Sequence, residues 1–532
     1  MGIKTKYLLL LLLAGGSIFF FNLGERDLWE PDETRYAVVA REMREGGNWI
    51  LPHLNGKIYA EKPPLFFWLV NLSTFLLGEN SEFTNRLPSA IAGLITLFVT
   101  FLFGEKLFNP RVGFLSAMVL ATSALFPQLS RWMMLDSLFT LLFLLTLFYF
   151  YLGFEKEERR RKYYLFAGFF IGLGVLTKGP IAFLVIPIFV IFAFSQKKVK
   201  AFWNLHLLWG TLLSFLAILL WLLPACWIGG EDYTKRILFG QTLGRLAGDE
   251  KSFHPEPFYF YFIRFPLDFF PWIVFLPSAI LLGFRKGEEI RKKFIFLLIW
   301  FLWIFFFFTL SQGKKDNYLL PLYPAAAILI GIYWDSGLRS SEGKWGAISG
   351  LVFLPLLFSI GFLLFIMGIP EKLYPALTAY HSIVFWPLFY LCLGSLLSAL
   401  FFLKKKKGVS FIIIAITFGL FQLHLSSLLP KFNPQRSMRA FSERILKRVG
   451  PEDELKIFSN RYHGLLYYTQ KPYIEQLGSI NRFSEILHSP QRVFVVIPLK
   501  HLGRIKKELN MEVETVEQTR IGSQDLGLIQ IN

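Results

Sequence analysis

The sequence predicts a polytopic α-helical membrane protein. The chain has 532 residues, 54% of them hydrophobic, and its mean hydropathy is +0.46. Apolar runs long enough to span a bilayer recur along the chain, and a transmembrane helix needs about 20 such residues. These runs are continuous rather than alternating, which excludes a transmembrane β-barrel.

The apolar segments follow one another from the N-terminus to residue 429. The first follows Lys4 and Lys6 and carries no small-residue cleavage site, so we expect a retained helix and not a cleaved signal. The segments are residues 7–23, 65–78, 88–107, 112–129, 133–153, 163–178, 181–195, 205–228, 268–284, 294–311, 318–334, 345–369, 384–403 and 409–429.

The charge of the loops orients these helices. The formal net charge is +18, and the positive-inside rule places the basic loops in the cytoplasm without a nucleic-acid partner. The rule holds along the chain if segment 65–78, which is short and follows Pro63-Pro64, lies on the outer surface. About thirteen transmembrane helices then remain, with the N-terminus inside and the C-terminus outside. The basic loops are residues 155–162, 196–200, 285–293 and 404–407.

Hydropathy drops after Pro430, which predicts two domains. Residues 1–430 form a transmembrane catalytic domain with external loops at 24–87 and 229–267. Residues 431–532 form a small α/β domain on the periplasmic side. Its expected helices are residues 437–449 and 501–509, and its expected strands are residues 455–458, 492–498 and 526–531.

Polar motifs gather in the segments assigned to the external face. Pro31 at the start and Gly46-Gly47 at the end predict an external helix. Asp32, in its first turn, is the candidate base or metal ligand. The alternative is that acidic residues here only complement the helix dipole. The neighbouring candidates for contact with a sugar or acceptor group are Glu33, Arg35 and Tyr36.

A second motif, Tyr59 to Pro64, precedes the short segment 65–78. It places the Glu61 carboxylate and the Lys62 ammonium at the boundary between water and lipid. In one interpretation, the rigid Pro63-Pro64 backbone holds Lys62 in place to contact a phosphate. In the other, Lys62 only extends its ammonium to the interface while its aliphatic stem lies in lipid. Tyr59 is a further candidate for substrate binding.

Asp136 opens an otherwise apolar helix, where a carboxylate is costly unless it is paired or faces a polar cavity. It is a catalytic candidate, and the alternative is a helix start with Arg131 as partner. Lys178 lies at the external end of the apolar helix 163–178, where complementarity with the helix dipole is the favoured explanation.

The external loop 229–267 and the segment after it supply the remaining candidates. Arg245 suits bidentate phosphate binding. His254 is a candidate metal ligand, although a lone histidine is more often structural. Tyr318 and Tyr323 are positioned to hydrogen-bond a lipid headgroup, while interfacial anchoring explains Tyr318 equally well.

Together, these carboxylates, cations and aromatic residues are expected to converge on one surface beside lipid. The sequence has no P-loop, nucleotide-binding glycine fingerprint or Cys/His metal motif. Cys226 and Cys392 lie inside apolar segments without metal or redox spacing. An activated donor is therefore expected to come from the membrane and not from a nucleotide sugar.

Five motifs, in this order along the chain, resemble those of the GT-C membrane glycosyltransferases of the protein-mannosyltransferase-like group. Within that group they are most similar to the lipid A aminoarabinose transferases. The likeness runs from about residue 20 to 330, weakens over 335–430 and is poor in the C-terminal domain. The motifs are WEPDETRYA, EKPPLFFW, RWMMLDS, LTKGP and YLLPLYPA.

The resemblance implies roles for individual residues. Asp32 matches the catalytic acidic position of the first loop, and Asp136 matches a second acidic site residue. Lys62 and Arg245 match basic positions that bind phosphate. Glu61 matches a position that binds a divalent metal, but the histidine expected beside that metal is not evident around residues 241–245. A divalent metal is therefore an open expectation, and no nucleotide cofactor is expected.

The resemblance also implies the reaction. The expected activity is inverting transfer of a sugar from a polyprenyl-phosphate donor to lipid A or a related envelope glycolipid. It takes place at the periplasmic face of the inner membrane. The alternatives are a protein O-mannosyltransferase-like enzyme and, from another class, a lipid flippase or transporter. A transporter would place its ionisable residues near the bilayer midplane.

Overall fold

The computed structural model describes residues 2–156, 158–198, 205–238, 256–285, 287–336, 341–369, 381–458, 462–488, 491–509 and 514–531. The chain divides into two compact units. The helical unit contains Met1–Phe21, Glu61–Phe66 and Leu87–Ser427, and the sheet unit contains Asn22–Ala60, Phe67–Arg86 and Leu428–Asn532.

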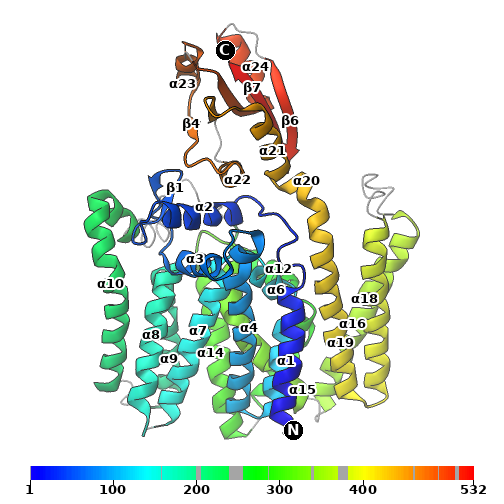
Figure 1. Ribbon diagram of the computed structural model, residues 1–532. Coiled ribbons are helices and arrows are strands. Elements are labelled where there is room, and N and C mark those ends of the chain that lie inside the picture. The colour runs from blue at the N-terminus through cyan, green and yellow to red at the C-terminus, as the bar shows by residue number, and fades with distance from the viewer. Residues whose placement is uncertain are drawn as a thin grey trace. The chain divides into compact units, whose positions relative to one another are not determined.

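The helical unit consists of long apolar helices and shorter helical segments (Figure 1). They are α1 (Ile3–Phe20), α4 (Glu82–Leu107, whose first turn belongs to the sheet unit), α5 (Pro110–Ala121), α6 (Leu125–Ser130), α7 (Leu135–Glu155), α8 (Arg160–Lys178), η1 (Pro180–Leu184), α9 (Val185–Ser195), α10 (Leu205–Lys235), α12 (Phe260–Asp268), η4 (Trp272–Phe275), α13 (Leu276–Gly283), α14 (Glu288–Leu310), η5 (Asp316–Leu322), α15 (Tyr323–Asp335), α16 (Ser341–Ile366), α18 (His381–Leu403) and α19 (Lys407–Leu428).

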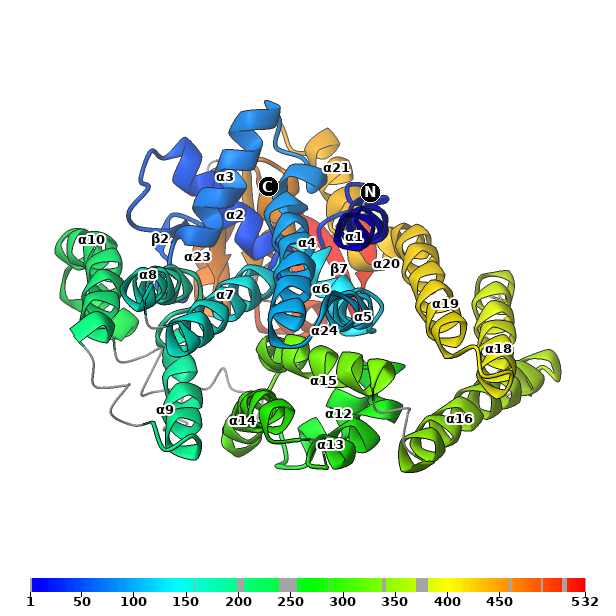
Figure 2. The ribbon, with the colours of Figure 1, turned by 90° about the horizontal axis from the view of Figure 1, so that it is seen from below.

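Neighbouring helices of this unit pack side by side. Figure 2 shows α8 between α7 and α10, α5 beside α15, and α16 beside α18, in agreement with their contacts. Among the described residues, nine helices are long and apolar enough to cross a membrane, and the bent pair α12 and η4–α13 makes a tenth span if counted as one. The chain is therefore a multi-pass α-helical membrane protein, as predicted, and the total of thirteen spans stays a prediction.

One of the expected apolar segments is broken, and another begins at a bend. Segment 112–129 ends as α5 at Ala121 and resumes as α6 at Leu125. Segment 268–284 begins at a bend, since α12 ends at Asp268 and the helical stretch that begins at Trp272 is turned by 108° from it. Pro271 stands at this bend and lacks the backbone N–H that a continuous helix requires.

Segment 65–78 forms α3 (Leu65–Leu77), which has 13 residues. At about 1.5 Å of rise per residue it is too short to span a bilayer. Its length agrees with the expectation that it does not cross, and its place on the outer surface stays a prediction.

The sheet unit contains a five-stranded mixed sheet in the order β4-β3-β5-β7-β6. β3 (Glu454–Phe458) pairs in parallel with β4 (Glu475–Leu477) and with β5 (Val493–Pro498). β7 (Gln524–Ile531) is antiparallel to both β5 and β6 (Thr515–Ile521). Side chains of the strands, of α23 (Ile480–Glu485) and of α24 (Leu499–Leu509) form its apolar core, which includes Phe483, Val495 and Ile505.

The C-terminal residues contain both helices and strands, and their forming a separate periplasmic domain stays a prediction. All three expected strands are present, and the expected helices are α21 (Arg439–Arg448) and α24. The sequence did not predict β4 and β6, which are the two edge strands of the sheet. β4 has only three residues, and the side chains of β6 are intermediate or exposed, so neither gives the apolar signal of a buried strand.

Segments far apart in the sequence build the rest of this unit. The predicted external helix is α2 (Asp32–Glu45), which contacts α22 (His463–Tyr468). The buried Arg41 guanidinium donates hydrogen bonds to the carbonyl oxygens of Leu466 (3.1 Å) and Lys471 (3.0 Å). The unit also contains the hairpin β1 (His53–Leu54) and β2 (Lys57–Ile58), and the short helices η8 (Leu429–Phe432), α20 (Asn433–Arg436) and η9 (Ile486–His488). This grouping of the first polar segment with the C-terminal residues is not evident from chain order.

Candidate active site

The first turn of α2 presents Asp32 beside Arg35. Pro31 precedes the helix and Gly46 caps its other end, as the sequence predicts. The Arg35 guanidinium forms an ion pair with Asp32 Oδ1 one turn away, and the two side chains are 20% and 22% exposed. The Arg35 guanidinium also lies 5.1 Å from the centroid of the Tyr36 ring. Asp32 is thus an oriented carboxylate that is still open to a small polar group.

The adjacent Glu33 has a different environment, because two arginines enclose it. Its carboxylate lies 2.7 Å from Arg26 Nη1 and 2.8 Å from Arg86 Nε, and all three side chains are buried. It also accepts a hydrogen bond from the Trp29 backbone N–H. Arg86 donates further to the carbonyl oxygens of Leu23 (3.0 Å) and of Asp27 (2.8 Å). Glu33 therefore joins the start of α2 to residues 23–29.

The pKa values of this cluster follow from burial and charge. Burial alone would raise the pKa of Glu33, but Arg26 and Arg86 outweigh it and lower that pKa to about 2. Burial and the neighbouring Arg86 lower the pKa of Arg26 to about 10, against the attraction of Glu33. Glu33 and Arg26 are therefore both charged at neutral pH. Contact of Glu33 with a substrate stays a prediction, and the contacts observed here give it a role in positioning α2.

Glu30 lies just before α2 and was not among the candidate residues of the sequence analysis. Its carboxylate accepts hydrogen bonds from the Thr34 hydroxyl (2.8 Å) and from the backbone N–H of Gly464. Burial raises its pKa from 4.5 to about 7, against the effect of these hydrogen bonds. The carboxyl group therefore titrates near physiological pH.

Glu30→Gln is expected to stabilise the protein at pH 8 and to change little at pH 5. The folded state binds the Glu30 proton more tightly than the unfolded state, so stability falls as the pH rises from about 4.5 through 7. Glutamine stays neutral and keeps an acceptor oxygen, so it removes this loss, which is worth up to about 3 kcal/mol. Thermal unfolding midpoints at both pH values measure the effect.

The matched control is Glu452→Gln, at an exposed position of the same unit. It should leave the pH dependence of the midpoint unchanged. If Glu30→Gln also retains the wild-type pH dependence, Glu30 does not titrate as stated.

Tyr36 and Tyr59, two of the predicted substrate-binding residues, both lie near the ring of Phe67. The Phe67 ring centroid is 6.0 Å from that of Tyr36 and 6.3 Å from that of Tyr59. Both tyrosines are buried. The structure thus brings these two predicted residues together through α3.

In the helical unit, Asp136 and Lys178 form a buried ion pair. Asp136 lies in the first turn of α7 and Lys178 is the last residue of α8. Lys178 Nζ is 2.5 Å from Asp136 Oδ1, and their side chains are 9% and 2% exposed. The same ammonium lies 5.1 Å from the ring centroid of Tyr318, another predicted residue, and 5.3 Å from that of Phe139. Lys178 is a member of this cluster that the sequence assigned only to a helix dipole.

Arg131, the expected alternative partner of Asp136, serves another helix. Its guanidinium donates hydrogen bonds to the carbonyl oxygens of Ile18 (2.6 Å) and Phe21 (2.5 Å) at the end of α1. Helix C-termini leave such carbonyls without intrahelical partners. Lys178 is an ion-pair partner of Asp136, and the pairing of Arg131 with Asp136 stays a prediction.

The remaining candidates differ in their surroundings. Glu61 and Lys62 are half-buried in the helical unit, just before α3. Tyr323 is fully buried, its ring packs edge-on against Phe265 and Phe269, and its hydroxyl has no hydrogen-bond partner among the described residues. Arg245 and His254 lie outside the described residues, so their roles stay predictions.

The expected metal ion also stays a prediction. Within the described parts of the chain, no three His, Cys, Asp or Glu side chains are grouped as metal ligands. Of the candidate ligands, these parts contain Asp32 and Glu61, whereas His254 lies outside them.

Comparisons with known proteins give this arrangement a context. The family model described as dolichyl-phosphate-mannose-protein mannosyltransferase matches residues 61–222. Curated relatives include the undecaprenyl phosphate-alpha-4-amino-4-deoxy-L-arabinose arabinosyl transferases of Pectobacterium carotovorum subsp. carotovorum and Pseudomonas aeruginosa. Each is 32% identical, and the alignments cover 63% and 60% of this chain and 60% and 58% of those relatives. The chain thus spans about 60% of the length of these relatives.

Solved structures extend the likeness to the whole fold. The crystal structure of ArnT from Cupriavidus metallidurans bound to undecaprenyl phosphate matches with a TM-score of 0.84 and 20% identity, over 99% of this chain and 98% of that one. The Archaeoglobus fulgidus oligosaccharyltransferase matches with a TM-score of 0.53 and 13% identity, over 94% of this chain and 70% of that one. The chain therefore has the predicted GT-C fold, and the resemblance of its motifs to the lipid A aminoarabinose transferases is confirmed.

Proposed function

We propose that this chain is an integral membrane glycosyltransferase. It transfers a sugar from a polyprenyl-phosphate donor to an envelope acceptor, namely lipid A or a related glycolipid. The reaction takes place at the periplasmic face of the inner membrane. The curated relatives support the donor class, since their names specify an undecaprenyl-phosphate-linked aminosugar as the substrate of an arabinosyl transferase.

The buried Asp136–Lys178 pair is the observation that carries the proposal. Charged side chains in a membrane protein are costly and mark functional sites. A transporter would place them near the middle of a spanning helix, but Asp136 is in the first turn of α7 and Lys178 is at the end of α8. Charged groups at helix ends suit a reaction at the membrane surface. The aromatic rings of Tyr318 and Phe139 lie beside the Lys178 ammonium.

The proposed chemistry is an inverting displacement. The acceptor oxygen attacks the anomeric carbon, the bond from that carbon to the phosphate oxygen breaks, and polyprenyl phosphate leaves with the bonding electron pair. Negative charge grows on the phosphate, and Lys62 and Arg245 are assigned to neutralise it. Asp32 accepts the proton when the acceptor is a hydroxyl group, whereas an acceptor that is already a phosphate anion needs only orientation. Arg35 holds the Asp32 carboxylate in place, and Asp136 is assigned to bind the sugar or the acceptor.

Lys62→Ala is expected to weaken use of the donor more than it weakens folding. The ammonium is half-buried, and its loss would leave a phosphate charge beside lipid without its cation. A charge-assisted hydrogen bond of this kind is worth about 1.5–3 kcal/mol, which corresponds to a fall in kcat/KM of about 10- to 100-fold. Steady-state transfer from a polyprenyl-phosphate sugar measures this effect.

Lys57→Ala is the matched control, because it also removes one ammonium group but at an exposed position of β2. It should retain wild-type kcat/KM. Equal kinetics in Lys62→Ala and wild type would show that Lys62 only extends its charge to the interface.

Mass spectrometry of the envelope tests the proposed acceptor. Lipid A and envelope proteins are compared between cells with and without the gene. The proposal predicts a sugar that is lost from lipid A or a related glycolipid and restored by the wild-type gene but not by its Asp32→Asn variant. A sugar lost from proteins while all glycolipids are unchanged would contradict it.

A protein acceptor is the second candidate function. It is favoured by the description of the family model that matches residues 61–222, a protein mannosyltransferase. The comparison of envelope proteins in the same experiment tests it. A mannose-type modification that disappears from proteins with loss of the gene would support this candidate over the glycolipid.

A further inference from the structure

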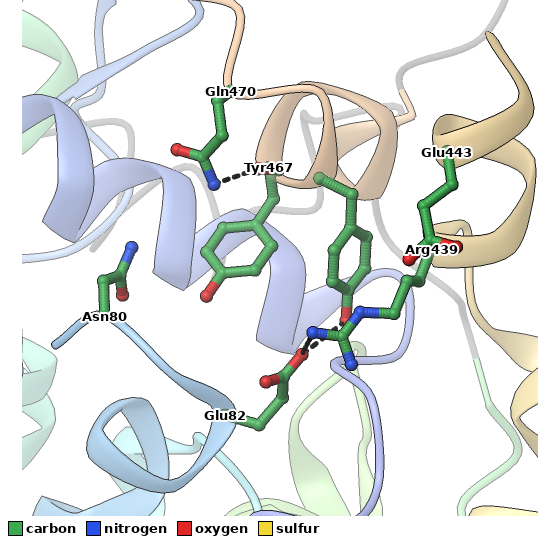
Figure 3. Close-up of a pocket in the computed structure, with 7 residues that line it drawn as sticks. Asn80, Glu82, Arg439, Glu443, Tyr467 and Gln470 are labelled. Atoms are coloured by element: carbon green, nitrogen blue, oxygen red, sulfur yellow. Dashed lines mark hydrogen bonds and ion pairs between the residues drawn. The ribbon is translucent and has the colours of Figure 1, made fainter. Parts of the chain in front are cut away.

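The sheet unit contains a polar pocket that shares no residue with the predicted catalytic site. Its volume is about 230 Å³. Side chains from residues 80–82, α21 and the end of α22 point into it (Figure 3). It is lined by Asn80, Glu82, Arg439, Glu443, Tyr467, Tyr468 and Gln470.

Contacts among the lining residues hold one wall of the pocket in place. Tyr468 donates a hydrogen bond to Glu82 Oε1 (3.2 Å) and accepts one from the Leu28 backbone N–H (2.8 Å). The Tyr467 hydroxyl accepts a hydrogen bond from Asn85 Nδ2 (3.1 Å). Gln470 donates to the Tyr467 carbonyl oxygen (3.0 Å). The aromatic wall therefore has little freedom to collapse into the pocket.

The single cation of the lining is already neutralised. Arg439 Nη2 lies 3.2 Å from Glu82 Oε1, and its Nη1 lies 2.8 Å from Asp27 Oδ1. Its guanidinium also lies 5.1 Å from the centroid of the Tyr468 ring, so it covers one side of that ring. An anionic ligand would have to displace two carboxylates from Arg439.

Other lining groups remain available for a ligand. The exposed Glu443 carboxylate, on the same helix as Arg439, has no hydrogen-bond or ion-pair partner among the described residues. Asn80 uses its side-chain oxygen to accept a hydrogen bond from Asn85 Nδ2 (2.9 Å), which leaves its two amide hydrogens as donors. The pocket thus offers one free carboxylate, amide donors and the half-buried ring of Tyr468.

This chemistry excludes several ligand classes. Phosphates and uronic acids would meet the unpaired Glu443 and an Arg439 that is already paired. The acidic residues of the pocket do not form a group of three metal ligands within the described part of the chain. A purely apolar ligand would leave the carboxylates and amides without partners, which is costly. The lining suits a small polyhydroxylated ligand that is neutral or positively charged.

We propose that this pocket binds one saccharide unit and prefers an amino sugar to a neutral or acidic one. Amide and carboxylate groups exchange hydrogen bonds with hydroxyl groups, and an ammonium gains a charge-assisted bond to Glu443. The half-buried Tyr468 ring supplies apolar surface on the side that Arg439 does not cover. The inference does not depend on the proposed transfer reaction, because it concerns binding in the absence of any donor.

Binding of free monosaccharides to the purified full-length protein tests this inference. Saturation-transfer NMR titrations compare glucosamine, glucose and glucuronic acid, which differ in the charge of one substituent. For a ligand of this size, dissociation constants of about 1–10 mM are expected. Glucosamine should bind most tightly, glucose about 10-fold more weakly, and glucuronic acid should not saturate.

Substitutions of residues that line the pocket test whether the sugars bind there. Glu443→Gln should reduce the affinity for glucosamine to that for glucose, and Asn80→Ala should weaken both sugars. Glu452→Gln, the same change at an exposed residue outside the pocket, and Asp32→Asn should leave binding unchanged. Both Glu443 and Glu452 are exposed, so neither variant is expected to disturb folding.

Three results would overturn the inference. They are the absence of saturation by all three sugars, tightest binding of glucuronic acid, and affinities that do not change in Glu443→Gln and Asn80→Ala. None of them would affect the proposed transferase activity, which is measured with a polyprenyl-phosphate donor. Conversely, loss of transfer in Asp32→Asn with normal sugar binding would leave the inference intact.

Discussion

Asp32→Asn is expected to lower the rate of sugar transfer by about two to four orders of magnitude, the usual contribution of a positioned acid or base. The substitution preserves the size of the side chain but removes its charge, so its ion pair with Arg35 is lost. Helix α2 should still form, because Pro31, Glu33 and Gly46 retain their positions at its ends. Steady-state transfer by the purified variant measures the effect, with the thermal unfolding midpoint recorded on the same sample.

Asp525→Asn is the matched control. Asp525 is also paired with an arginine, Arg520 at 3.7 Å, and it is 56% exposed on β7. The same loss of charge there should leave both turnover and stability unchanged. If Asp32 served only the helix dipole, its loss would cost at most about 1 kcal/mol of local stability. Near-normal turnover in Asp32→Asn would therefore reject its catalytic assignment.

Glu33→Ala is expected to cause the largest loss of stability. It leaves Arg26 and Arg86 buried without their shared carboxylate, and removing one partner of a buried ion pair costs about 3–5 kcal/mol. The start of α2 would also lose its link to residues 23–29. A markedly lower thermal unfolding midpoint of the purified variant is the expected observation.

Glu45→Ala removes a carboxylate from the other end of the same helix, where the side chain is 56% exposed. That variant should unfold near the wild-type temperature. Equal stability of the two variants would contradict the structural role of Glu33. A change in KM without a change in the unfolding midpoint would instead support the predicted contact of Glu33 with substrate.

Local signals in the sequence predict the helices and the buried strands. Pro31 and Gly46-Gly47 delimit α2, and the apolar run VFVVIP gives the central strand β5. The bend between α12 and η4 is harder to infer, because the apolar character continues across it. The edge strands β4 and β6 lack a continuous apolar face, so sequence pattern alone did not reveal them.

The polar clusters depend on contacts between distant parts of the chain. Lys178 pairs with Asp136, 42 positions away, and Arg86 pairs with Glu33, 53 positions away. Composition and spacing identify Asp136 as a carboxylate in need of a partner, yet they do not select that partner. The sequence identified Glu33 as a candidate for contact with a substrate. It could not show that two arginines enclose the Glu33 carboxylate, because these arginines are distant or unmarked in the sequence.

Transfer by the purified protein in lipid vesicles tests the central claim most directly. The vesicles contain an undecaprenyl-phosphate-linked aminosugar and lipid A, and mass spectrometry follows both the sugar on lipid A and the released undecaprenyl phosphate. The account predicts that the two products appear in equal amounts with the wild-type chain, and that both fall by about two to four orders of magnitude with Asp32→Asn. A wild-type chain that moves the donor across the bilayer without cleaving it would contradict the account.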